Sequence, residues 1–341
     1  MIKKLWCHLS KRRRNQFFLI LILMIFASIM EIISIGAVLP FLGALTSPET
    51  IYQNKIFQPL IMLLGITEAN QLLFPLTIIF IVATLIAATV RLLLLYASTR
   101  LSFAAGADLS LDIYRRTLYQ DYEVHTSRNS SDVINSIITK TSTVINLVLT
   151  PLINLISSVI IMLGIIGIIS TINIEVALFT FLTFALLYSF ITYFTKKYLR
   201  NNSKLIASES TEMIKSLQEG LGGIRDVLID NTQEFYCRLY KKSDLSMRKA
   251  SGNNVFIGSS PRYLMEAIGM TLIAGLAFMM TKQENGIVAA IPILGALALG
   301  AQRLLPALQQ AYSAYSTIKG SNSSFEDVLN LLDQPLPDYV D

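Results

Sequence analysis

Six stretches of the sequence are apolar over the length that a bilayer requires. They fall at about residues 17–45, 72–96, 144–170, 176–194, 263–281 and 287–318. A helix needs about 20 mostly apolar residues to cross roughly 30 Å of hydrocarbon. Charged residues make up only 15% of the chain, whereas soluble domains carry roughly a quarter. The sequence therefore predicts an all-α membrane protein with six transmembrane helices.

Lysine and arginine are distributed unevenly around these stretches. Six of them lie between residues 3 and 14, and the long connections 97–143 and 195–262 carry most of the others. The three remaining loops hold only Lys55 and Lys282. Short loops rich in Lys and Arg stay on the cytoplasmic side of a membrane. We therefore expect a multi-pass protein of the cell inner membrane, with both termini and both long connections in the cytoplasm.

The two long connections keep apolar residues at helical spacing, as in residues 109–118. Each is predicted to be a helix that leaves the membrane, a short turn and a helix that returns. About 20 residues in each arm, at 1.5 Å per residue, reach roughly 30 Å into the cytosol. The turns fall near Tyr122 and Gly222. The alternative is a pair of soluble helical hairpins with no mechanical role.

Several short motifs in this arrangement carry a family resemblance. They are residues 114–122 (YRRTLYQDY), 129–132 (NSSD), 223–227 (GIRDV), 233–235 (QEF), 261–266 (PRYLME) and 303–306 (RLLP). Together with six spans and two long excursions, they resemble the transmembrane domain of ATP-binding-cassette (ABC) exporters. The last two motifs resemble the branch that contains the bacterial lipid-linked oligosaccharide flippases.

The resemblance implies a transporter, or flippase, that works by alternating access as a homodimer. Its substrate would be an amphipathic lipid, and the flippase branch points to a lipid-linked oligosaccharide. The excursion tips would be coupling helices that dock on a nucleotide-binding domain, which would hold ATP and Mg. The tip residues implied are Asp121, Tyr122, Glu123, His125, Gly222, Gly223, Ile224, Arg225 and Asp226. No nucleic-acid partner is expected.

The resemblance also implies a domain that this sequence does not contain. Family members of this type usually continue into an ATPase domain, but no Walker A motif occurs here. We interpret residues 1–320 as the transmembrane domain and 321–341 as a linker toward the nucleotide-binding domain. That domain was either removed from the sequence or is a separate polypeptide. The full-length protein would then be an ATP-hydrolysing translocase.

Four ionisable residues fall inside the predicted spans, where charge is costly and is a functional hypothesis by default. By rise per residue, Arg91, Glu266 and Arg303 lie at matching depth, about 24 Å below the outer ends of their spans. Glu31 shares a helical face with Ser28 and Ser34 but is expected to lie too far outward to pair with the other three.

Two interpretations of these charges compete. Glu266 forms an ion pair with Arg303 or Arg91, or the arginines form a basic ring that holds the phosphates of an anionic lipid. Arg91 also has the alternative of extending its side chain to the lipid headgroups. With Arg262 at the start of the fifth span, these residues are the candidates for the substrate pathway: Glu31, Arg91, Arg262, Glu266 and Arg303.

Other function classes fit the sequence less well. An exporter of peptides or hydrophobic drugs on the same scaffold is the first alternative. A secondary transporter needs no excursions of this length, and an intramembrane enzyme needs a cluster of His, Cys or carboxylates within the spans. We expect no catalytic or metal site, because the chain has only two histidines and two cysteines and neither pair has ligand spacing.

Overall fold

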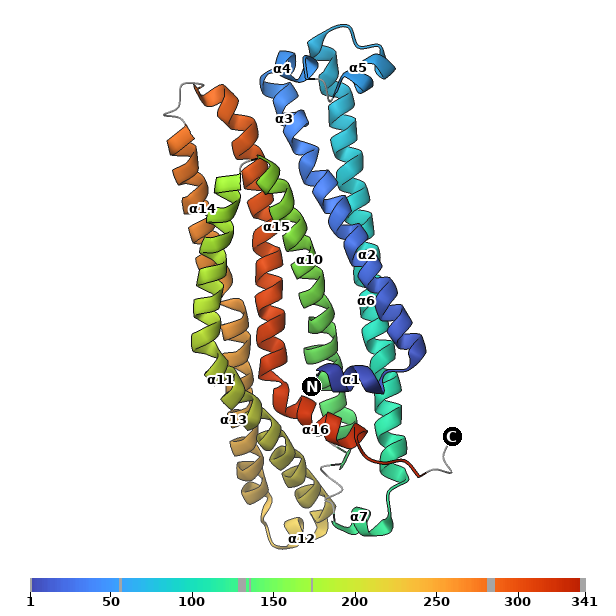
Figure 1. Ribbon diagram of the computed structural model, residues 1–341. Coiled ribbons are helices and arrows are strands. Elements are labelled where there is room, and N and C mark those ends of the chain that lie inside the picture. The colour runs from blue at the N-terminus through green and yellow to red at the C-terminus, as the bar shows by residue number, and fades with distance from the viewer. Residues whose placement is uncertain are drawn as a thin grey trace.

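Helices account for every regular element among the residues that the structure describes, which are 2–54, 57–127, 133–134, 136–172, 174–280 and 286–337. The structure is a computed structural model (Figure 1). The first half of the chain forms α1 (Ile2–His8), α2 (Lys11–Gly36), α3 (Val38–Thr46), α4 (Pro48–Tyr52), α5 (Gln58–Leu64), η1 (Ala69–Leu72), α6 (Leu73–Leu118), α7 (Tyr122–Ser127), η2 (Ser136–Lys140), α9 (Thr141–Val144), η3 (Ile145–Leu149) and α10 (Thr150–Ile172). The second half forms α11 (Ile174–Gly222), α12 (Ile224–Ile229), α13 (Gln233–Ser259), α14 (Pro261–Met280), α15 (Gly286–Gly320) and α16 (Asn322–Leu332).

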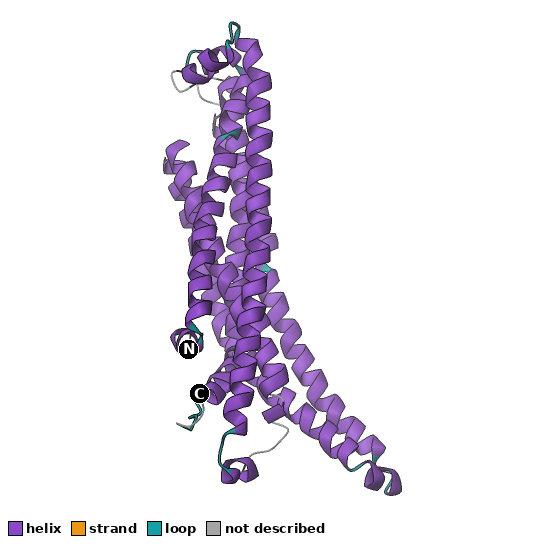
Figure 2. Cartoon of the chain, turned by 90° about the vertical axis from the view of Figure 1, so that its right-hand side faces the viewer, coloured by secondary structure: helices purple, strands orange, loops and turns teal. Residues whose placement is uncertain are grey.

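The long helices lie along the axis of an elongated bundle. The short helices α7 and α12 lie at one end, here called the tip end, and α4 and α5 lie at the other, the loop end (Figure 1). The hairpin of α11 and α13 diverges from the foot of α6, so that α12 and α7 are separate tips (Figure 2). The helices nearest the chain ends, α1 and α16, lie in the part of the bundle closer to the tip end (Figure 1). The location of both termini in the cytoplasm stays a prediction.

Three helical segments among the described residues are long and apolar enough to cross a membrane: Lys11–Thr46, Ala69–Leu118 and Ile137–Ile168. They contain the first two predicted spans and all but the last two residues of the third. The other three predicted spans lie on α11, α14 and α15, and each includes residues whose side chains fall outside the described part of the chain. The count of six spans therefore stays a prediction.

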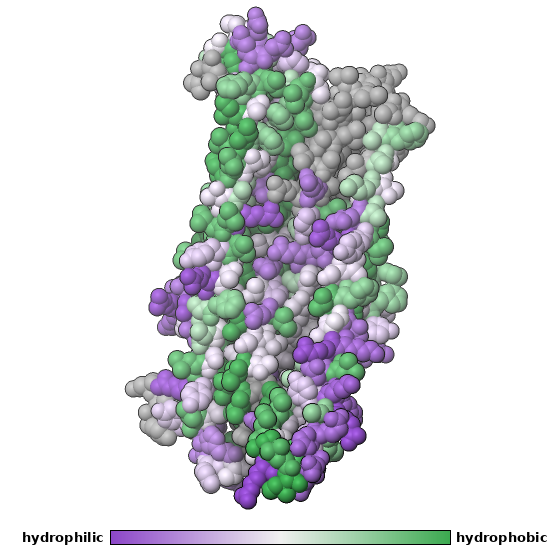
Figure 3. Space-filling view, turned by 180° about the vertical axis from the view of Figure 1, so that it is seen from behind, coloured by the Kyte–Doolittle hydropathy of each residue, from purple (hydrophilic) through white to green (hydrophobic). Residues whose placement is uncertain are grey.

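The surface of the bundle is divided by polarity. On the face seen in Figure 3, apolar residues predominate in the coloured upper part of the bundle below a polar cap at the loop end, and polar residues become frequent toward the tip end. Large apolar side chains such as Phe18 and Ile25 on α2 and Ile81 and Leu85 on α6 are exposed. Exposed apolar helices of this kind are expected to face lipid.

Helix α2 is interrupted where the sequence places a proline. It begins after Ser10, whose hydroxyl accepts a hydrogen bond from the backbone N–H of Arg13. It ends at Gly36, four residues before Pro40, because the proline ring has no N–H and clashes with the carbonyl one turn earlier. Along its length α2 packs against α6 and α10 through apolar side chains that include Met24 and Leu94.

The returning limb of the first excursion is less regular than the sequence suggests. Two short π-helices, η2 and η3, interrupt it before α10 begins. At η3 the side chain of Ile145 lies against Gly106 of α6, where a Cβ atom would overlap it. Ala105 and Leu109 on the same side of α6 are almost completely buried. A glycine at 106 therefore permits the close approach of the two limbs.

The second excursion is a long hairpin of α11 and α13. Across it, Asn202 donates a hydrogen bond of 2.8 Å to the amide oxygen of Asn254. Near its tip a Cβ atom at Gly220 would lie 3.3 Å from the ring of Tyr236. None of the tip glycines Gly220, Gly222 and Gly223 has a positive φ, so none of them is there to allow a left-handed backbone conformation. Gly220 serves close packing instead.

The segment predicted to be a linker contains α16, which packs into the bundle. Phe325 and Leu332 of α16 join a buried cluster with Leu5 and Ile113. Asp333 accepts hydrogen bonds from Lys4 at 2.8 Å and from His8 at 3.0 Å. The hydrogen bond from Lys4, and after it the one from His8, lowers the pKa of the Asp333 carboxyl from its ordinary value. Residues 322–333 are therefore part of the body of the bundle.

Candidate functional site

A first hollow, cavity A, lies between α2, α6 and α10 and has a volume of about 480 Å³. Its wall is partly apolar, with Met24, Leu92 and Ile161 among the side chains that line it. Two charged residues line it as well: Nη1 of Arg91 lies 3.8 Å from Oε1 of Glu31. The Glu31 side chain is 7% exposed and that of Arg91 is 44% exposed. The carboxylate is therefore the buried member of the pair.

The prediction that Glu31 lies too far from Arg91 to pair with it is wrong. That prediction measured the two residues from opposite ends of their spans. Measured from the loop end, Glu31 lies roughly 22 Å from Thr46 and Arg91 roughly 27 Å from Leu73, at 1.5 Å per residue. An extended arginine side chain covers the difference. The arginine thus reaches across the α2–α6 contact to the carboxylate.

Ser28, Glu31 and Ser34 share one face of α2, as their spacing in the sequence indicates. Ser28, Glu31 and Ser34 are each about 5% exposed and all face the interior of the bundle. The hydroxyl of Ser28 donates a hydrogen bond of 3.2 Å to the carbonyl of Ile160 on α10. This polar face is therefore directed toward α10, which the sequence did not predict.

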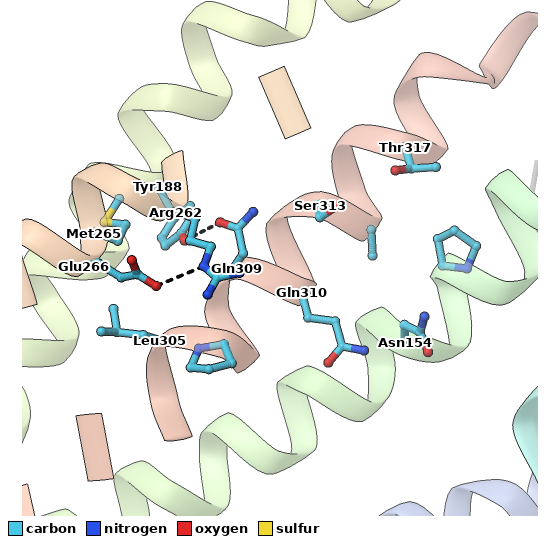
Figure 4. A pocket seen from close by; sticks show the side chains of 13 residues that line it. Asn154, Tyr188, Arg262, Met265, Glu266, Leu305, Gln309, Gln310, Ser313 and Thr317 are labelled. Carbon is cyan, nitrogen blue, oxygen red and sulfur yellow. Dashed lines mark hydrogen bonds and ion pairs between the residues drawn. The ribbon is translucent and has the colours of Figure 1, made fainter. Parts of the chain in front are cut away.

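A second hollow, cavity B, lies between α10, α11, α14 and α15 and has a volume of about 360 Å³ (Figure 4). Arg262 and Glu266 of α14 line it as an ion pair, with Nε of the arginine 2.9 Å from Oε1 of the glutamate. The hydroxyl of Tyr188 donates to the amide oxygen of Gln309 at 3.4 Å. The amide nitrogen of Gln309 donates to the carbonyl of Gly258 at 2.9 Å. Gln309 is therefore held at both ends of its amide.

The predicted pair of Glu266 with Arg91 is wrong, because Arg91 pairs with Glu31 and Glu266 with Arg262. The partner of Glu266 lies four residues earlier on its own helix, a spacing at which side chains are neighbours. The depth of each residue in the membrane, on which the predicted pair rested, does not show that Glu266 prefers a partner on its own helix. The Arg303 side chain falls outside the described residues, so the pair of Glu266 with Arg303 stays a prediction.

The two cavities adjoin at residues that the sequence analysis missed. Asn154 of α10 and Gln310 of α15 line both cavity A and cavity B. Ser313 and Thr317, further along α15, line cavity B and also a third hollow of about 380 Å³ nearer the tip end, cavity C. Uncharged polar residues give a weak signal in a membrane helix. Their spacing of three and four residues on α15 is the one signal that could have revealed them.

The two predicted coupling sites form short exposed helices. Tyr122, the first residue of α7, is 82% exposed. Asp121, Glu123 and His125 beside it are exposed as well. In the other tip, Gly223 is the N-cap of α12, and Ile224, Arg225 and Asp226 form its first turn. All three of these α12 residues are exposed, and so is Gly222.

The tip at α12 also exposes apolar side chains that the sequence analysis did not assign. Leu221, Ile224, Leu228 and Ile229 are all exposed, and only Val227 of the helix is buried. An exposed apolar cluster at the end of a polar arm is typical of a protein-binding surface. The arrangement can therefore form a contact that combines apolar residues with Arg225 and Asp226.

Comparison with known protein families adds an independent observation. Residues 15–283 match the ABC transporter transmembrane region. The match begins in α2 and includes both tips, the Glu31–Arg91 pair and the Arg262–Glu266 pair.

Proposed function

Because this chain belongs to the family of ABC transporter transmembrane regions, we propose that it is the membrane-spanning half of an ATP-driven exporter that moves an amphipathic lipid. Membership of the family implies a membrane location and a nucleotide-binding domain as partner. The adjoining cavities A and B carry the proposal for the substrate, because they combine apolar walls with ion pairs and amides. A pocket of this composition suits a ligand with both an apolar chain and a polar headgroup.

The proposed pathway uses the charged residues that line the two cavities. Arg91 and Arg262 would attract the headgroup, and Arg303 would complete a basic ring around an anionic group such as a phosphate. Glu31 and Glu266 would hold Arg91 and Arg262 in place until the substrate arrives. An arginine that exchanges a carboxylate for a phosphate keeps its charge paired throughout, which limits the cost of its burial.

The proposed energy source lies on the partner domain. ATP with Mg would bind there, and the tips α7 and α12 would transmit its movements to the bundle. Two copies of this chain would enclose one pathway, which would open alternately to either side. The exposed apolar residues on α12 support a protein contact at that tip.

The substrate within this class is a finer proposal. A lipid-linked oligosaccharide would place its glycan among the amides and its isoprenoid chain against the apolar wall. An exporter of peptides or hydrophobic drugs is the second candidate, and the apolar lining of cavity A by Met24, Leu92 and Ile161 favours it.

The proposal is tested by reconstituting the transporter, with its nucleotide-binding domains, in liposomes that contain a fluorescent polyprenyl-pyrophosphate glycan. We expect ATP-dependent movement of the lipid between leaflets and none with a non-hydrolysable ATP analogue. Arg91→Gln and Arg303→Gln should each slow it. Export of a hydrophobic dye or peptide without movement of the lipid would favour the second candidate and refute the first.

A further inference from the structure

Two amide side chains occupy the junction of cavities A and B. Asn154 projects from α10 and Gln310 from α15 into the space between these helices (Figure 4). Asn154 is half-buried and Gln310 is exposed to the hollow. Neither amide is hydrogen-bonded to any residue that the structure describes, in contrast to the neighbouring Gln309, whose amide has a partner at each end. The two amides are thus available to a ligand.

The charges on either side of this junction are already paired. In the described lining of cavity A, Arg91 faces Glu31, and in that of cavity B, Arg262 bonds Glu266. The junction itself therefore presents uncharged groups, among them the hydroxyl of Ser157 on the side of cavity A and that of Ser313 on the side of cavity B. This arrangement differs from an anion site, where cationic donors converge on one point.

The hydrogen-bonding capacity of these groups indicates what they recognise. A primary amide donates two hydrogen bonds and accepts at its oxygen, and a hydroxyl also both donates and accepts. A phosphate without bound protons can only accept, so it would leave the amide oxygens of Asn154 and Gln310 unsatisfied. A hydroxyl-rich headgroup satisfies both ends of each amide.

We propose that Asn154 and Gln310 are specificity-determining residues, which hydrogen-bond the uncharged, hydroxyl-rich part of a headgroup that extends across both cavities. The inference rests on the proposed lipid export and assigns residues that select among its substrates. A ligand that lacks hydroxyls would leave donors and acceptors of the two amides without hydrogen bonds. The cost of those unsatisfied groups makes the site select against such a ligand. Loss of one such hydrogen bond is expected to weaken binding about tenfold.

The test compares two probes with the same apolar chain, so that its contribution cancels. Labelled dodecyl maltoside presents an uncharged polyhydroxyl headgroup, and labelled dodecyl phosphate presents an anion. Their affinities are measured on the transporter with its nucleotide-binding domains in lipid nanodiscs. The variants are Asn154→Leu and Gln310→Met, which keep the size of the side chain. Gln302→Met, an exposed amide on α15 outside the three cavities, is the matched control.

We expect each junction variant to weaken maltoside binding about tenfold, with dodecyl phosphate binding unchanged and the control like the wild type. Equal losses for both probes, or no loss for the maltoside, would overturn the proposal, as would a wild type that binds only the phosphate. If a Leu or Met variant fails to fold, Asn154→Ala and Gln310→Ala, which remove the amide and leave a larger cavity, take its place. The binding assay does not depend on transport. If binding is selective as expected but the liposomes show no movement of lipid, the proposed function is refuted and the role of the two amides is not.

Discussion

Arg91 of α6 and Glu31 of α2 form an ion pair of 3.8 Å between a buried carboxylate and a half-exposed guanidinium. The pair joins the first two predicted spans at cavity A. A buried charge that loses its partner costs far more than an exposed one. The two members of this pair are therefore not equivalent.

Removal of Arg91 should destabilise the protein more than removal of Glu31. Arg91→Gln leaves a buried carboxylate without its cation and should cost about 1–3 kcal/mol, less than for a fully buried pair because the arginine is partly exposed. Glu31→Gln should cost less, and the double variant should recover part of the loss from Arg91→Gln. Thermal unfolding in detergent measures all three. If the two single variants lose the same amount of stability, the greater burial of the Glu31 carboxylate has no energetic consequence.

Glu266 and Arg262 should behave differently, since the Glu266 side chain is half-exposed, the Arg262 side chain is mostly exposed, and the two lie one turn apart on α14. Exposed pairs at this spacing contribute about 0.3–0.5 kcal/mol. Glu266→Gln should therefore change the unfolding temperature very little. Any loss of transport would then come from an altered contact with the substrate or with the proposed basic ring that includes Arg303. A large loss of stability on Glu266→Gln, restored by Arg303→Gln, would indicate instead that these two residues pair.

Membrane orientation is testable with introduced thiols. Cys7 and Cys237 are both exposed and free, so they are replaced first. A membrane-impermeant maleimide added to intact cells should label Gln53→Cys at the loop end and leave Gly222→Cys at the tip end unlabelled. Permeabilised cells provide the control, in which both should react. Labelling of the tip in intact cells would reverse the proposed topology.

The tips should be needed for coupling and not for folding. Tyr122→Ala and Arg225→Glu alter exposed side chains, so that expression and unfolding temperature should stay near those of the wild type. Transport by the transporter with its nucleotide-binding domains should fall at least about tenfold, the equivalent of about 1.4 kcal/mol of lost contact. Arg238→Glu is the control, because Arg238 is also exposed but lies on α13, outside the tip helix α12. Full transport in both tip variants would exclude docking through these residues.

Gly106 and Gly252 make a matched pair of helical glycines with opposite expected outcomes. A Cβ atom at Gly106 would overlap Ile145, whereas nothing lies within 4 Å of one at Gly252. Gly106→Ala should destabilise by about 1–3 kcal/mol through overpacking. Gly252→Ala should stabilise by up to about 1 kcal/mol through helix propensity. Unfolding temperatures measure both, and adding Ile145→Ala should relieve the first effect. Tolerance of Gly106→Ala alone would mean that Ile145 can move away.

Much of the fold follows from patterns within single elements. Apolar length predicted the first three spanning segments, and helical periodicity predicted both excursions with their tips near Tyr122 and Gly222. The same periodicity placed Ser28, Glu31 and Ser34 on one buried face. These features depend on rise and rotation per residue, which each helix carries in its own sequence.

Relationships between elements required the tertiary structure. The tilt and register of α2 against α6 bring Glu31 to Arg91, although counting along each span separated them. The junction amides Asn154 and Gln310 come from helices about 150 residues apart in the chain, and neither has a charge that would mark it. Packing also decided that α16 joins α1 and α6, because its apolar face is completed by side chains from both. The register of one helix against another depends on how many side chains interdigitate at once, and no single segment encodes it.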